Sequence, residues 1–226
     1  MIRKLVAALA AAALSFGATA VVAAVPVVNV GDTIHFADGP GASPGGAFVL
    51  TAYSGSSTTV TGSFQSFCLE TDETMNYTGL FTVAGITNTA NAGGANTNSG
   101  DVLSLQTEWL YKQFMESAGA LGTTWNALSA VDQGTAMQQA IWLLEGEITS
   151  TSNTTATNLI GLANTAVTAG WTDIGDRVRV LNINYASGAL AQDQLYIMPV
   201  PEPESYALFL AGLGLMGLIV RRRRSA

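Results

Sequence analysis

The sequence predicts a mainly β fold with a helical insertion, an α+β domain whose strands form an antiparallel sandwich or a barrel-like sheet. Short runs rich in Val, Thr, Phe and Tyr, separated by Gly, Pro and Ser, occupy both flanks of the middle region, as strands do. Between these flanks, apolar residues recur at steps of three and four, which is the period of a helix. A length of 226 residues favours one such domain.

Six segments carry the strand pattern, four before the helical centre and two after it. They are 33–36, 47–53, 58–69, 77–83, 177–184 and 194–199. The segment 88–100 is made mostly of Asn, Thr, Ala and Gly and has no periodicity. It is therefore predicted to be a mobile surface loop.

The centre predicts three helices. The first covers 103–121, where one apolar face is formed at helical spacing. Its apolar positions are Leu110, Phe114, Ala118 and Leu121. Ser129, followed three residues later by Asp132, resembles a capping box and opens a second helix that runs to about residue 147. A weaker pattern predicts a third helix over 157–169.

The first 24 residues have the pattern of a secretory signal peptide. Arg3 and Lys4 precede an apolar run over 5–16, and small residues follow. Cleavage after Ala20 and cleavage after Ala24 fit this pattern equally well. The alternative is an uncleaved anchor helix, but the apolar run is shorter than the roughly 20 residues that a membrane span needs.

The C-terminal segment combines prolines, a short apolar stretch and a basic end. Pro199, Pro201 and Pro203 restrict φ and disfavour helix before them, so this part is predicted to be extended and accessible to a processing enzyme. The uncharged stretch 206–220 reaches only about 22 Å as a helix, against a hydrocarbon core of about 30 Å. The basic end consists of Arg221, Arg222, Arg223 and Arg224. Such a cluster holds the C-terminus on the cytoplasmic side of a single short transmembrane helix.

This segment resembles the PEP-CTERM sorting signal, through Pro201-Glu202-Pro203, the short apolar helix and the arginine cluster. The alternative is an ordinary C-terminal tail anchor. The resemblance implies recognition by an exosortase, a membrane processing enzyme, after export by the Sec machinery and signal peptidase. The predicted organisation is a signal peptide at 1–24, a β-rich ectodomain at 25–198 and the sorting segment at 199–226.

Charge and cysteine content exclude several functions. The cations between residues 25 and 200 are Lys112, Arg177 and Arg179, against fourteen carboxylates, which gives a net charge of −11. This acidic middle region repels phosphate, so nucleic acid is not a predicted partner. Cys68 is the one cysteine of the sequence, so no disulfide can form within the chain.

Most residues that could carry enzymatic chemistry lack partners in the sequence. His35 is the one histidine, and it lies in a strand pattern without a serine elbow or metal-ligand spacing. Glu70, Asp72 and Glu73 could form a weak calcium site, but a solvated acidic turn is the better interpretation. Glu145 and Glu147 are two residues apart on a helix and cannot face each other. No catalytic residue, cofactor or metal is predicted, and the chain is not expected to be an enzyme.

Cys68 and Gln138 form the one remaining candidate pair. Cys68 follows Phe67 near the end of a strand pattern, and Gln138 shares a helical face with Ile141 and Trp142. These residues resemble the thioester domains of bacterial surface adhesins, which join a Phe-Cys or Tyr-Cys motif to the Gln of a Thr-Gln-x-Ala-Ile-Trp motif. Here Met137 stands in place of the Thr.

The resemblance implies that the Cys68 thiol displaces ammonia from the Gln138 carboxamide and forms an internal thioester. An amine on a neighbouring polymer would then take the acyl group, while Phe67, Ile141 and Trp142 would shield the bond from water. This thioester is the alternative function. The predicted function is that of an exported envelope or biofilm-matrix protein with a structural or adhesive role, in which Cys68 and Gln138 are buried structural residues. The PEP-CTERM resemblance implies a Gram-negative bacterium and exopolysaccharide as a further partner. An exported hydrolase is the remote alternative.

Overall fold

The computed structural model describes residues 25–42, 45–73, 77–91, 100–200 and 209–213. Strands flank a helical centre, in the order that the sequence predicts. The strands are β1 Thr33–Ala42, β2 Gly45–Tyr53, β3 Val60–Ser66, β4 Leu80–Thr87, β5 Thr89–Ala90, β6 Asp101–Val102, β7 Val178–Tyr185 and β8 Leu190–Ile197. The helices are α1 Leu105–Glu116, the 3-10 helix η1 Ala118–Leu121, α2 Thr123–Asn126, α3 Ala130–Leu144 and α4 Thr154–Thr168.

Six strands form one antiparallel sheet in the order β3-β2-β1-β4-β7-β8. The sheet curls until its two edges meet. Leu195 N donates to the Phe67 carbonyl at 3.0 Å, Leu69 N donates to the Asp193 carbonyl at 3.1 Å, and Cys68 bridges Gln194. The segment after β3 thus pairs with β8, and the sheet closes as a barrel-like layer.

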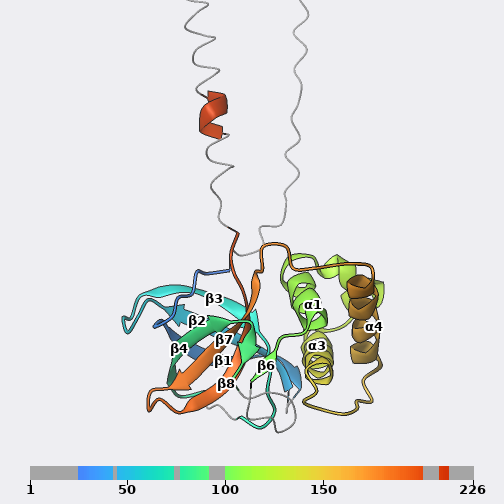
Figure 1. The fold of residues 1–226 in the computed structure, drawn as a ribbon, viewed down its shortest axis with the longest axis horizontal. Coiled ribbons are helices and arrows are strands. Elements are labelled where there is room, and N and C mark those ends of the chain that lie inside the picture. The colour runs from blue at the N-terminus through green and yellow to red at the C-terminus, as the bar shows by residue number, and fades with distance from the viewer. Residues whose placement is uncertain (1–24, 43–44, 74–76, 92–99, 201–208, 214–226) are drawn as a thin grey trace, which may run out of the picture.

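Helices α1, α3 and α4 gather on one side of this sheet (Figure 1). Two buried apolar clusters follow from that arrangement. One lies inside the curled sheet and contains Phe36, Phe81 and Tyr196. The other lies between the sheet and the helices and contains Tyr111, Met137 and Ile141. The β-rich α+β prediction is therefore confirmed at the level of fold class.

The helix boundaries follow the caps. Ser104 caps α1 by accepting from Thr107 N, and Ser129 caps α3 by accepting from Asp132 N, as the capping pattern predicts. The first predicted helix, 103–121, is shorter in the structure. Helix α1 ends at Glu116, Ser117 leaves the helical conformation, and the chain continues as η1. The prediction of a loop throughout 88–100 is wrong at its start, since Thr89–Ala90 pairs with β6.

No helix among the described residues is long and apolar enough to span a bilayer. Residues 209–213 are helical, and they lie within the predicted anchor 206–220. The rest of that anchor, the Pro201-Glu202-Pro203 triplet, the arginine cluster and the signal peptide lie outside the described residues.

The buried carboxyl group of Glu108, in the first turn of α1, gives a pH-dependent stability. Burial, with the charges of Asp173 and Asp176, raises its pKa to about 7. The folded chain therefore binds this proton more tightly than the unfolded chain does, and the resulting stabilisation is complete below the ordinary carboxyl pKa and is lost as pH rises through about 7. We expect the melting temperature to fall between pH 5 and pH 8 by less in Glu108→Gln than in the wild-type protein.

Thermal unfolding of both proteins across this pH range measures the difference. Asp72→Asn is the control, since Asp72 is an exposed carboxylate that makes no ion pair with another described residue. Equal pH profiles for the wild-type protein and Glu108→Gln would contradict the assignment.

Candidate functional site

Cys68 lies on the short segment that closes the sheet. Its neighbours Phe67 and Leu69 make the backbone hydrogen bonds to β8, so the position of Cys68 is fixed from both sides. Side chains alternate along this extended segment. Phe67 accordingly belongs to the cluster beneath the helices, whereas Cys68 belongs to the cluster inside the sheet. Cys68 is 1 % exposed.

Gln138 reaches Cys68 from α3, which glycines allow to lie close to the β1–β2 hairpin. A methyl group at Gly134 would lie 1.9 Å from the Pro40 carbonyl oxygen. A methyl group at Gly45 would lie 2.9 Å from ring carbons of Trp142 and 3.3 Å from Cγ of Gln138. The distances of 1.9 Å and 2.9 Å are too short for a side chain to be accepted without a shift, so glycine at these two positions sets how near the helix comes to the strands.

The Gln138 carboxamide is paired with both the backbone and the thiol of Cys68. Its Oε1 accepts from Cys68 N at 3.1 Å and from Cys68 Sγ at 3.2 Å, and its Nε2 donates to the Cys68 carbonyl at 2.7 Å. Gln138 is 0 % exposed. The structure therefore brings together two residues that are 70 positions apart in the sequence, and it fixes the orientation of the carboxamide relative to the sulfur.

The surroundings keep the thiol protonated. Burial raises the pKa of the Cys68 thiol, and the charges of Glu70 and Glu147 raise it further. Hydrogen bonding by the Cys68 backbone and by the Trp142 indole N–H has the opposite effect and lowers the pKa of the thiol. The Trp142 N–H is buried and has no conventional hydrogen-bond acceptor among the described residues, so its proximity to the sulfur is its main polar interaction. A free thiolate is therefore disfavoured at this site.

A pocket of about 550 Å³ opens beside the sulfur. Cys68 and Trp142 line it together with residues of the β1–β2 hairpin. Its further lining includes Asp38, Phe48, Thr71, Tyr77 and Gln192. A small molecule or an extended side chain can therefore approach Cys68 from this side, whereas the opposite side is packed core.

The three predicted shielding residues differ in position. Phe67 and Ile141 are 0 % exposed and lie in the core cluster beneath the helices. Trp142 is partly buried and lines the pocket together with Cys68. Asp38 was not identified as a site residue from the sequence, because it lies on β1, far along the sequence from the Cys68 and Gln138 motifs.

The interpretation of Glu70, Asp72 and Glu73 as a solvated acidic turn is wrong for Glu70, which is 1 % exposed. Glu70 Oε2 accepts from Asp193 N at 2.8 Å, which ties this segment to β8. Burial and the charge of Asp193 raise the pKa of Glu73. Within the described residues, no group of three or more His, Cys, Asp or Glu side chains could hold a metal ion.

The remaining candidates have structural partners. Glu145 accepts from Ser104 Oγ at 2.6 Å, whereas Glu147 accepts from Thr71 N and Oγ1 at 2.9 Å. The two carboxylates thus have different partners. The prediction that both lie on a helix reaching residue 147 is wrong, because α3 ends at Leu144 and Glu145 is its C-cap. His35 lies in β1, where it pairs with Thr51 of β2 and Leu80 of β4.

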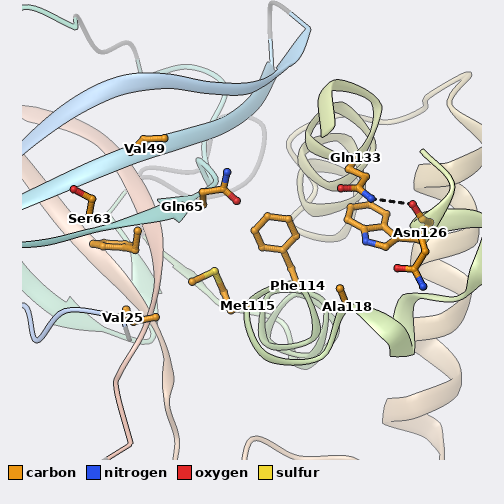
Figure 2. A pocket seen from close by; sticks show the side chains of 11 residues that line it. Val25, Val49, Ser63, Gln65, Phe114, Met115, Ala118, Asn126 and Gln133 are labelled. Carbon is orange, nitrogen blue, oxygen red and sulfur yellow. Dashed lines mark hydrogen bonds between the residues drawn. The ribbon is translucent and has the colours of Figure 1, made fainter. Parts of the chain in front are cut away.

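A second hollow of about 500 Å³ lies between the β2–β3 strands and the helices (Figure 2). Phe114 and Met115 point into it from α1, and the amides of Gln65 and Gln133 lie on opposite sides. Gln133 Nε2 donates to the Trp125 carbonyl at 2.9 Å. The described residues that line this hollow include neither a charged side chain nor a thiol.

Comparison with known proteins bears on the C-terminal end. No curated protein and no solved structure matches the chain. A family model described as the PEP-CTERM protein-sorting motif matches residues 199–224. That match agrees with the proline triplet, the apolar stretch and the arginine cluster of the sequence. The chain therefore carries a PEP-CTERM sorting signal and is sorted by an exosortase toward the cell surface.

Proposed function

We propose that the chain is an adhesive protein of the envelope or biofilm matrix that attaches itself covalently to amine-bearing polymers through a Cys68–Gln138 thioester. The observation that carries this proposal is the 3.2 Å separation of Cys68 Sγ and Gln138 Oε1, with the carboxamide held by the Cys68 backbone. Export toward the surface, which the sorting motif provides, would place the bond where such polymers occur. We place the protein in a Gram-negative envelope, where exopolysaccharide is a further partner.

Thioester formation is an exchange within the chain. The Cys68 sulfur attacks Cδ of Gln138, the C–S bond forms, and the C–N bond breaks. The thiol proton ends on the departing nitrogen, which leaves as ammonia, so no net charge is created. During the attack negative charge develops on Oε1, and the Cys68 N–H that already donates to this atom would stabilise it.

Transfer to an acceptor reverses the role of sulfur. An amine nitrogen attacks Cδ, the C–S bond breaks with its electron pair on sulfur, and the proton lost by nitrogen restores the Cys68 thiol. The product is an amide between Gln138 and the acceptor. Burial of both residues supports a slow competing reaction with water. Each molecule reacts once, so the protein is a chemical tether and we propose no catalytic turnover.

Intact mass of the secreted protein tests the thioester directly. We expect a mass below the sequence value by one ammonia, about 17 Da. Cys68→Ala and Gln138→Ala should each abolish the deficit. Gln139→Ala is the matched control, since Gln139 is the next residue of α3 and bonds Thr151 instead.

Treatment with hydroxylamine should convert the deficit into an adduct in the wild-type protein alone. A secreted wild-type protein whose mass equals that calculated for its processed sequence would overturn the thioester. Cys68 and Gln138 would then be structural residues of a sorted surface protein.

A further inference from the structure

We propose that the acceptor is an unhindered primary alkylamine that arrives as its ammonium ion and is held by Asp38 at the mouth of the Cys68 pocket. This inference rests on the proposed thioester and names its acceptor class. Asp38 is exposed, whereas Cys68 forms the inner end of the same pocket. Among the described lining residues, Asp38 is the one charged side chain.

The position of Asp38 is set by the β1–β2 ladder. Asp38 pairs with Phe48 directly across the two strands, so their side chains project from the same face of the sheet. The ring of Tyr77 stacks on Phe48 with centroids 6.2 Å apart. Burial raises the pKa of the Tyr77 hydroxyl, and the charge of Asp38 raises it further, which agrees with their common position around the pocket.

The carboxylate of Asp38 is free to bind a ligand. It makes no ion pair or hydrogen bond with another described residue. By contrast, Glu147 is already bonded to Thr71, and Glu145 to Ser104. A carboxylate beside aromatic faces is a typical environment for an alkylammonium ion, because the charge and the rings both attract the cation.

The wider field also favours a cation. Residues 25–200 carry a net charge of −11, and Glu70 and Glu147 lie near enough to Cys68 to raise the pKa of its thiol. Negative potential around a concave site raises the local concentration of cations and their rate of association. Neutral hydroxyl groups of sugars gain nothing from this field, so an amine-bearing chain is selected over a plain polysaccharide.

The reaction balances with Asp38 as the first proton acceptor. The ammonium ion gives one proton to the Asp38 carboxylate, which passes it to solvent. The neutral amine then leaves Asp38, moves inward past Phe48 and Trp142 to Cys68, and attacks Cδ of Gln138. The C–N bond forms, the C–S bond breaks, and the second nitrogen proton ends on the Cys68 sulfur. The products are a secondary amide and a free thiol. The aliphatic stem of the acceptor would lie along Phe48 and Trp142, which line the path.

The experiment compares two nucleophiles on the full secreted protein near neutral pH. Butylamine is almost fully protonated there, whereas hydroxylamine is mostly uncharged. Adduct formation is followed by intact mass for the wild-type protein, Asp38→Asn and Asp72→Asn. Asp72→Asn is the control because it changes the net charge by the same amount as Asp38→Asn. Asp72 is also exposed, but it does not line the pocket.

We expect Asp38→Asn to slow the butylamine reaction by about tenfold and to leave the hydroxylamine reaction unchanged. Asp72→Asn should change neither rate. Added salt should slow the reaction of butylamine with the wild-type protein and have little effect on its reaction with Asp38→Asn. A butylamine rate unaffected by Asp38→Asn, or an equal loss with both nucleophiles, would overturn the role of Asp38 while the thioester stands. A wild-type protein that lacks the ammonia deficit and reacts with neither nucleophile would overturn both.

Discussion

Gly134→Ala is expected to destabilise the protein by about 2 kcal/mol and to reduce the fraction of molecules that lose ammonia. In most helix interiors the same substitution stabilises by roughly 0.5–1 kcal/mol. Here the new methyl group would lie 1.9 Å from the Pro40 carbonyl oxygen, so α3 must move away from the β1–β2 hairpin. Gln138 is one turn further along the same face and would move away from Cys68 with the helix.

Gly161→Ala is the matched control for this experiment. Gly161 lies inside α4, and a methyl group there would meet no atom within 4 Å. This variant should be more stable than the wild-type protein by roughly 0.5–1 kcal/mol and should keep the full ammonia deficit. Chemical denaturation gives the free energies, and intact mass gives the extent of thioester formation. Stabilisation by Gly134→Ala would show that α3 does not depend on this close approach.

Asp193→Ala should cost on the order of 3–5 kcal/mol, because it leaves several buried donors without an acceptor. Asp193 is 0 % exposed. Its carboxylate accepts from Asn91 N at 2.7 Å, from Asn182 Nδ2 at 2.7 Å and from Ile183 N at 3.0 Å. These bonds join β7, β8 and Asn91, and the backbone carbonyl of Asp193 also pairs with Leu69, next to Cys68. We therefore expect incomplete thioester formation as well as lower stability.

Asp72→Ala removes an exposed carboxylate and should change the free energy of unfolding by no more than about 0.5 kcal/mol. Denaturant titration of both variants, followed by intact mass of the folded fraction, separates stability from chemistry. If Asp193→Ala unfolded at the wild-type denaturant concentration, the network around this carboxylate would not be a main source of stability.

Local patterns predicted the elements well, because each depends on neighbouring residues. The Ser129 cap and the start of α3 follow from a hydroxyl and the N–H group three residues later. The closure of the sheet could not be predicted in this way. It depends on hydrogen bonds between Phe67 and Leu195 and between Leu69 and Asp193, which are too distant in sequence for any periodic pattern to link.

The candidate site divides in the same manner. The pairing of Cys68 with Gln138 was suggested by resemblance to a motif, since nothing in their spacing of 70 residues implies contact. Burial of Glu70 was missed because a charged residue after a strand usually lies in water. The repeated glycines of the 39–46 segment were the one available signal that another element packs closely there.

The closure of the sheet affects how copies of the protein behave when many of them are packed close together. Exposed strand edges act as templates on which neighbouring molecules add further strands. Where residues 67–69 join β8, the outermost backbone groups are already satisfied by the same chain. Copies crowded together outside the cell would therefore be less prone to merge there into amyloid-like ribbons, and each could remain a separate unit.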